Sequence, residues 1–144
     1  MNPLALDNQL CFRLYAASKA VIRLYQPLLK ALNLTYPQYL VMLVLWEEKS
    51  QVRLNDIGQR LHLDSGTLTP LLKRMAEQGL IRREKSRQDE RALAISLTEA
   101  GRALEEDAAR IPSQLMCQTQ ADMQDVTQLK TQLDTLLARL LPQA

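Results

Sequence analysis

The chain of 144 residues is poor in the residue types that build metal, disulfide and phosphate sites. It has a single histidine, His62, and two cysteines, Cys11 and Cys117, that stand far apart in the sequence. One histidine excludes a multi-histidine metal centre, and two distant cysteines form neither a disulfide framework nor a metal-ligand spacing. With only four glycines the chain has no Gly-rich phosphate loop. We therefore expect no metal and no cofactor.

Long apolar runs and an extreme net charge are also missing. The longest apolar run, at 39–46, is too short to span a bilayer, and the first residues lack a signal-peptide pattern, so we expect a cytoplasmic protein without a membrane partner. A net charge of +2 excludes a uniformly basic chain, but ten basic and seven acidic residues lie in 53–102. In contrast, 103–144 holds three basic and six acidic residues. On charge alone, a local anion-facing surface and a solvated charged loop explain this asymmetry equally well.

The scarcity of glycine and proline and the abundance of leucine and alanine predict a mainly helical chain. Apolar spacing predicts a first helix that starts after Asp7 as its N-cap and fades near residue 32. The "TYPQ" sequence at 35–38 is a capping-box pattern and predicts a second helix that runs to about Glu48. Further helices are predicted over 55–63 with Asn55 as N-cap, 63–80 with Asp64 or Ser65 at its start and Gly79 at its end, 98–111 with Thr98 as N-cap and a bend at Pro112, and 125–141.

The middle of the chain carries a pattern typical of DNA-binding proteins. An extended piece is predicted at 50–54, and alternating stretches at 81–86 and 91–97 predict a hairpin. Two short helices followed by such a hairpin form a winged helix-turn-helix pattern. The second helix opens with "DSGTLT", whose short hydroxyl side chains let a helix N-terminus approach a DNA groove. The alternative is an ordinary capped helix whose hydroxyls satisfy only their own backbone, but the wing and its basic cluster favour DNA.

Residues 63–101, "LDSGTLTPLLKRMAEQGLIRREKSRQDERALAISLTEAG", resemble the MarR family of bacterial winged-helix repressors. The resemblance implies a mainly α fold with a small β-hairpin wing, in a homodimer whose N- and C-terminal helices interlock. We therefore expect one continuous domain with three parts: 1–48 for dimerisation and sensing, 50–97 for DNA binding, and 98–144 for dimerisation. The implied partner is double-stranded DNA with a pseudo-palindromic operator.

The same resemblance assigns the DNA contacts. Arg91 is expected to enter the minor groove with Asp89 as its orienting partner, while Lys85 and Arg87 are expected at phosphates. The residues expected on the recognition helix are Ser65, Thr67, Thr69, Pro70, Lys73 and Arg74.

The first helix carries a thiol beside phenols. Cys11 and Tyr15 stand four positions apart and share a helix face. Tyr25 lies on the same side but about 21 Å along the helix, so only the Tyr25 of a second copy could reach Cys11. A cysteine near a helix N-terminus is stabilised as its thiolate, the form that reacts with peroxides. From the residues alone, an ordinary packing helix is the more frequent explanation.

The stretches "LCFRLY" (10–15) and "LTYPQYLVMLVLWE" (34–47) resemble the OhrR branch of this family, the organic-hydroperoxide-responsive regulators. The resemblance implies that Cys11 is the redox sensor and that Tyr25 and Tyr36 hydrogen-bond it across the dimer, with Tyr15 as a third aromatic. Cys117 would resolve the oxidised thiol as an intersubunit disulfide.

The implied protein is a repressor, not an enzyme, that releases its operator when organic hydroperoxides oxidise Cys11. A repressor relieved by a small aromatic ligand, with incidental thiols, is the alternative. A peroxide-reducing thiol enzyme is disfavoured because no thiol-peroxidase loop motif is apparent and the winged-helix features would have no purpose.

Overall fold

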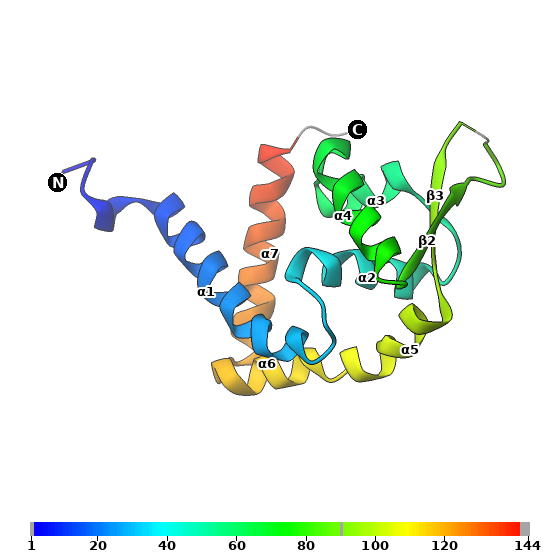
Figure 1. Ribbon diagram of the computed structural model, residues 1–144. Helices are drawn as coiled ribbons and strands as arrows, with labels where there is room; N and C mark the ends of the chain where they lie inside the picture. Colours follow the sequence, from blue (N-terminus) through cyan, green and yellow to red (C-terminus); the bar gives the residue numbers. More distant parts are fainter. Residues whose placement is uncertain (1, 90, 142–144) are drawn as a thin grey trace. The chain divides into compact units, whose positions relative to one another are not determined.

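The computed structural model describes residues 2–89 and 91–141, which fall into two compact units, Met1–Ile111 and Pro112–Ala144. The first unit contains a 3-10 helix (Leu6–Asn8), α1 (Leu10–Lys30), α2 (Tyr36–Glu48), β1 (Val52–Arg53), α3 (Leu54–Leu61), α4 (Ser65–Glu77), β2 (Ile81–Lys85), β3 (Leu93–Leu97) and α5 (Glu99–Ala108) (Figure 1). The remaining helices are α6 (Ile111–Thr119) and α7 (Met123–Leu140). The predicted mainly helical fold with a β-hairpin is confirmed, and the extended piece at 50–54 adds a third strand in the order β1-β3-β2.

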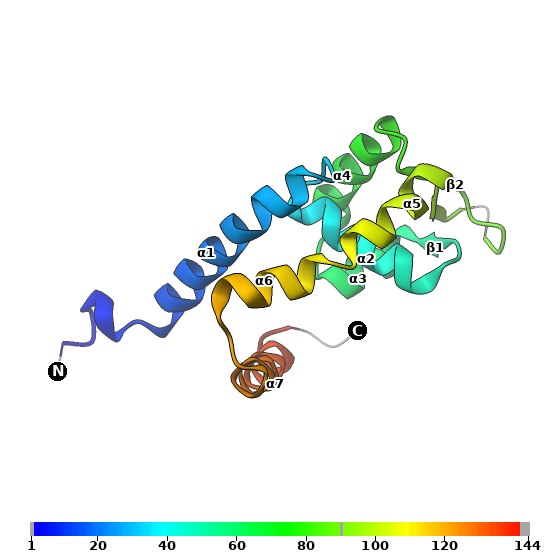
Figure 2. The ribbon, with the colours of Figure 1, turned by 90° about the horizontal axis from the view of Figure 1, so that it is seen from below.

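The start of α1 differs from the prediction. Asp7 lies inside the 3-10 helix and does not cap α1; the N-cap is Gln9, whose side chain makes no capping bond. Instead, the Gln9 side chain donates to the carbonyls of Pro3 (2.7 Å) and Ala5 (3.0 Å), which stabilises the 3-10 turn ahead of the helix. As a result Cys11 is the second residue of α1. The N-terminal half of α1 extends away from the other helices of its unit, and only Leu29, near its far end, is fully buried (Figure 2).

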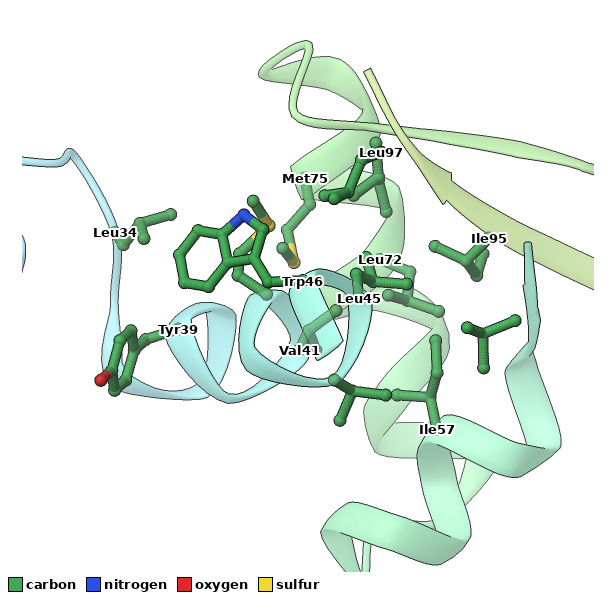
Figure 3. Close-up of a cluster of buried hydrophobic side chains, with 14 of the residues drawn as sticks. Leu34, Tyr39, Val41, Leu45, Trp46, Ile57, Leu72, Met75, Ile95 and Leu97 are labelled. Carbon is green, nitrogen blue, oxygen red and sulfur yellow. The ribbon is translucent and has the colours of Figure 1, made fainter. Parts of the chain in front are cut away.

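Helix α2 is the centre of the first unit. Its predicted capping box is confirmed: Thr35 Oγ1 accepts from the Gln38 backbone N–H, and Gln38 Oε1 accepts from the Thr35 N–H at 3.1 Å. The helix is apolar on most of its circumference, so it packs against neighbours on several sides. Figure 3 shows its core side chains among those of α3, α4 and β3; the labelled residues of these four elements include Val41, Leu45, Trp46, Ile57, Leu72, Met75 and Ile95.

The helix-turn-helix follows the predicted order with one wrong cap. Helix α3 begins at Leu54 with Arg53, not Asn55, as N-cap, because β1 pairs with β3 through Arg53 and the chain enters the helix directly from the strand. Helix α4 is capped by Asp64, whose Oδ1 accepts from the Thr67 N–H at 2.7 Å. Gly79, with φ of 80°, follows the end of α4 in the left-handed conformation that favours glycine.

The C-terminal helices also depart from the prediction in detail. The helix capped by Thr98 does not bend at Pro112; α5 ends at Ala108, and Pro112 stands in the first turn of a separate helix, α6, where its missing N–H costs no helical hydrogen bond. Helix α7 begins two residues earlier than predicted because Asp122 Oδ1 accepts from the Gln124 N–H at 3.1 Å.

One junction connects α2, α4, the sheet and α5. Thr98 Oγ1 caps α5 through the Gly101 N–H (3.1 Å) and donates to the Gly79 carbonyl (2.6 Å). The Thr98 N–H donates to Leu80 O at 3.1 Å, and Trp46 Nε1 donates to Gly101 O at 3.0 Å. A Cβ at residue 101 would collide with the carbonyl oxygen of Leu80, so only glycine allows this close approach of two backbones.

The Gly101→Ala variant should therefore lose stability. Because Leu80 O is held by the Thr98 N–H, it cannot move aside, and we expect a loss of about 1–3 kcal/mol in the free energy of unfolding. Urea unfolding at fixed protein concentration measures it, with the fluorescence of Trp46, the single tryptophan, as the probe.

The matched control is Gly66→Ala in α4, where the nearest atom to a new Cβ is Asp64 Oδ1 at an ordinary 3.6 Å. Alanine favours helix over glycine, so this variant should be as stable as the parent or more stable. Equal losses in the two variants would contradict the role assigned to Gly101.

Candidate nucleic-acid interface and thiol site

Burial of one side of α4 exposes the opposite side. Leu68, Leu72 and Met75 are completely buried and determine how the helix is rotated against α2 and α3. All the residues predicted for the recognition helix are exposed: Ser65, Thr67, Thr69, Pro70, Lys73 and Arg74. The structure thus places hydroxyl groups near the helix start and two cations further along the same helix.

The hydroxyl groups of this helix differ in what they bond. Hydrogen bonding from the Thr67 side chain, and then from its backbone, lowers the pKa of the Asp64 carboxyl group. The Thr67 hydroxyl is therefore used within its own helix cap, as in the alternative in which the hydroxyls of this helix do not contact DNA. Ser65 and Thr69 have no side-chain hydrogen bond within the described part of the chain. These two hydroxyls are available to an external acceptor or donor.

The wing is a polar turn between β2 and β3. Asp89 Oδ1 accepts from the Arg91 backbone N–H at 3.0 Å, and the Asp89 carbonyl accepts from the Ala92 N–H at 3.0 Å. Asp89 therefore orders the backbone that carries Arg91, a side chain-to-backbone turn typical of aspartate. Lys85, Arg87 and Arg91 are exposed. Glu90 lies outside the described residues.

The two thiols are both exposed. Cys11 lies in the first turn of α1, and Cys117 lies in α6, in the other unit. Tyr15, one turn after Cys11, is exposed and accepts a hydrogen bond from Lys19 Nζ at 3.2 Å; the same ammonium lies 5.0 Å from the Tyr15 ring centroid. Because the ammonium supplies the proton of that bond, the Tyr15 hydroxyl can still donate its own.

Three tyrosines gather where α1 meets α2. The ring centroids of Tyr25 and Tyr36 are 4.9 Å apart, and Tyr39 lies 5.7 Å from Tyr25 and 6.2 Å from Tyr36. Burial raises the pKa of all three phenols, and for Tyr25 the neighbouring phenols raise it further. The hydroxyl groups therefore keep their protons to higher pH and remain hydrogen-bond donors.

Sequence reasoning missed Tyr39, which is 3% exposed and also contacts the Trp46 ring, with centroids 6.5 Å apart. Its spacing of three positions from Tyr36 on one helix was the available signal. The tyrosine cluster and Cys11 stand at opposite ends of α1, about four turns apart. A single chain does not bring them together.

Large apolar side chains are exposed on the first and last helices. On α1 they are Leu10, Phe12, Tyr15 and Val21, and on α7 they are Met123, Leu129, Leu137 and Leu140. Exposed apolar side chains in this number mark interaction surfaces. No helix in the described residues is long and apolar enough to cross a membrane, and no cluster of three or more potential metal ligands occurs among them.

Comparison with known proteins agrees with this geometry. A family model described as transcriptional regulator SarA/Rot matches residues 23–108. The chain is 51% identical over 135 residues to the organic hydroperoxide resistance transcriptional regulator of Bacillus subtilis, an alignment that covers 94% of this chain and 91% of the relative. Reduced AbfR bound to DNA, from Staphylococcus epidermidis, aligns with a TM-score of 0.78, 37% identity and 95% of both chains.

Two further solved structures extend the comparison. Disulfide-formed AbfR aligns with a TM-score of 0.67, 39% identity and 92% of both chains. A MarR mutant from E. coli, complexed with operator DNA, has the same fold, with a TM-score of 0.75, 23% identity, and coverage of 92% of this chain and 94% of that one. The named relatives are transcriptional regulators and not enzymes, as expected for this chain. The chain thus belongs to the MarR family of winged-helix transcriptional regulators, in the branch of the organic hydroperoxide resistance regulators.

Proposed function

We propose that this regulator is a homodimeric repressor that binds double-stranded DNA when Cys11 is reduced and releases it when an organic hydroperoxide oxidises Cys11. The observation that carries the proposal is the position of Cys11, exposed in the first turn of a helix whose other end holds protonated tyrosines. The names of the relatives support it: one is an organic hydroperoxide resistance regulator, and AbfR has been solved reduced on DNA and in a disulfide form.

The sensor needs two copies of the chain. Cys11 and Tyr25 are about 21 Å apart along one α1 helix, which no hydrogen bond spans. An α1 helix from a second subunit, running antiparallel, brings Tyr25 and Tyr36 of the partner subunit to the first turn of this one. The exposed apolar faces of α1 and α7 supply the buried area that such a dimer requires.

The oxidation has two balanced steps. The Cys11 thiolate attacks one peroxide oxygen, the O–O bond breaks, the sulfur becomes a sulfenic acid, and the organic fragment leaves as an alcohol after taking a proton. The Cys117 thiol of the partner subunit then attacks the sulfenic sulfur, which forms a disulfide and releases water. Phenol hydroxyls donating to the sulfur favour the thiolate before the first step.

DNA binding uses the surface of α4 and the wing. The exposed start of α4 enters the major groove, where Ser65 and Thr69 contact DNA and Lys73 and Arg74 lie near phosphates. Arg91 enters the minor groove from a turn ordered by Asp89. Twofold symmetry places the half-sites about one helical turn apart. A disulfide between α1 and α6 of different subunits changes the spacing of the two α4 helices and releases the DNA.

The Cys11→Ser variant should keep DNA binding but lose the response to oxidant. Fluorescence anisotropy measures both, with DNA selected from a random pool by the reduced protein and cumene hydroperoxide as the oxidant. The parent should release the DNA, and the serine variant should retain it. Release by Cys11→Ser would disprove the thiol mechanism.

The Cys117→Ser variant separates the two oxidation steps. It should still form the Cys11 sulfenic acid, which a dimedone adduct of 138 Da detects by mass spectrometry in the same oxidant. It should not give the covalent dimer that the parent gives on a non-reducing gel. A parent protein that forms no oxidant-dependent covalent dimer would argue against the resolving role of Cys117.

Removal of the wing cation should weaken DNA binding. The Arg91→Ala variant is expected to lose about 1–3 kcal/mol of binding free energy, with a salt slope smaller by about 1. Its control is Lys130→Ala on α7, an exposed lysine paired with Asp134, which removes one positive charge from a helix of the other unit. Equal affinities of Arg91→Ala and the parent across a salt titration would refute the wing assignment.

A charge on the apolar face of α7 should weaken the dimer. Leu129 is 56% exposed in the single chain, and Leu129→Asp replaces an apolar contact with a carboxylate in both subunits. We expect the dimer dissociation constant to rise by about a hundredfold or more. Sedimentation velocity over a concentration series measures it, with Gln128→Asp, the neighbouring exposed polar position, as control. The dimer interface is not on this face if the two variants dissociate alike.

A further inference from the structure

The outer face of the wing sheet forms a polar hollow, and of its lining cations only Arg87 is predicted to contact DNA. Pairing of β2 with β3 places Ile81 opposite Leu97 on the face toward the core, and Arg82 opposite Ser96 on the other face. On that outer side, the sheet, the end of α2, the 50–51 connection, α3 and α5 enclose a space of about 650 Å³. All its lining residues belong to the first unit.

The hollow concentrates positive charge. Its lining includes the cations Lys49, Arg53, Arg82, Arg87 and Arg102, against two carboxylates, Asp56 and Glu84. No ion pair joins any of these side chains in the described part of the chain. The cations come from the end of α2, β1, β2, the wing turn and α5, so the fold and not a run of sequence gathers them. Several arginines that line one hollow without ion-pair partners are typical of sites for phosphate or carboxylate groups.

The floor of the hollow leaves room for a ligand. Three β3 residues line it, and two of them, Ala94 and Ser96, are small; the third, Leu97, ends the strand. Ala94 faces Glu84 on one neighbouring strand and Arg53 on the other, whereas Ser96 faces Arg82. Long charged side chains thus surround two small ones, and the surface between them is concave, like the sites that hold small molecules.

We propose that this hollow binds a small polyvalent anion, with phosphate or carboxylate groups held by Arg82 and Arg102 and by the cations at the rim. The mostly polar and charged lining does not suit the small aromatic ligand considered as an alternative inducer. The proposed anion site depends only on this geometry. The proposed effect of the anion on DNA binding depends, in addition, on the proposed function.

The hollow is connected to the wing by two side-chain hydrogen bonds. Gln51 Oε1 accepts from the Arg87 backbone N–H at 3.3 Å, and Arg53 Nη2 donates to Gln88 Oε1 at 3.4 Å. Both bonds join the β1 segment to the turn that leads to Arg91. An anion that engages the Arg53 guanidinium competes with Gln88 for it, so occupancy of the hollow changes how the wing turn is held. The ligand thereby adjusts DNA affinity independently of the thiols.

The test is an NMR titration of the reduced, full-length Cys11→Ser protein, in which thiol oxidation plays no part. Inorganic pyrophosphate and citrate serve as separate probes for phosphate and carboxylate ligands, at constant ionic strength. We expect saturable shifts of the Ala94 and Ser96 amide signals with at least one probe, and the tighter probe identifies the ligand chemistry. Shifts that fail to saturate with both probes, or that spread over all basic residues, would overturn the site.

Adjacent residues of β2 provide a matched pair of variants. Arg82 lines the hollow, whereas Arg83, also exposed, points to the other face of the sheet. Arg82→Gln should weaken probe binding by about tenfold, as expected for the loss of one charge-assisted hydrogen bond, and Arg83→Gln should leave it unchanged. Arg102→Gln, on α5, is a second variant that leaves the sheet intact and should weaken binding similarly. Equal effects of Arg82→Gln and Arg83→Gln would overturn the proposal.

The same cations could instead contact the phosphates of DNA. A DNA titration distinguishes a small-anion site from such a DNA contact. If the hollow serves a small anion, Arg82→Gln without probe keeps the parent's salt slope for DNA. A slope that falls as it does for Arg91→Ala would make the hollow a DNA-backbone contact and would overturn the small-anion site. The effect on the wing is tested in the same assay: the probe concentration that half-changes the DNA affinity of the parent should be about tenfold higher for Arg82→Gln.

Discussion

The close contact between Gly101 and the Leu80 carbonyl is the constraint on which the rest of the first unit depends. It lets α5 leave the sheet directly beside the end of α4, where Thr98 bonds both the α5 N-terminus and the Gly79 carbonyl. Trp46 of α2 joins the same junction through its indole N–H. The helix that carries the candidate DNA contacts and the helix that leads out to the C-terminal unit are therefore held at one point.

The fold was predictable where a local interaction dictates the structure. The "TYPQ" box, the cap at Thr98 and the turn at Gly79 are decided within a few residues and were predicted correctly, and the Asp64 cap was one of the two starts left open for α4. The wrong caps lie where a competing element intervenes: a 3-10 turn precedes α1, and a strand paired with β3 runs directly into α3. A local sequence pattern does not reveal such a competing element, because that element forms with partners elsewhere in the chain.

Candidate site residues could be named from the sequence, but their arrangement could not. Helical periodicity predicts Cys11 and Tyr25 on one side of α1, and the structure adds that Tyr25 belongs to a cluster with Tyr36 and Tyr39. The hollow behind the wing was not predictable from the sequence, because its cations come from five separate segments, in helices, strands and a turn, that only the folded chain brings together. Sequence patterns identify residues that share an element, whereas tertiary structure identifies residues that share a space.

The central position of α2 decides whether the helix-turn-helix and wing of this chain can be separated from the rest of the first unit. The side chains that close the core of the helix-turn-helix, Ile57 and Leu72, pack in one cluster with Val41 and Leu45 of the preceding helix (Figure 3). The winged helix consequently shares its hydrophobic core with α2. Transplanting the helix-turn-helix and wing without α2 would expose part of this core, and a substitution on the buried side of α2 also alters the packing of α3 and α4.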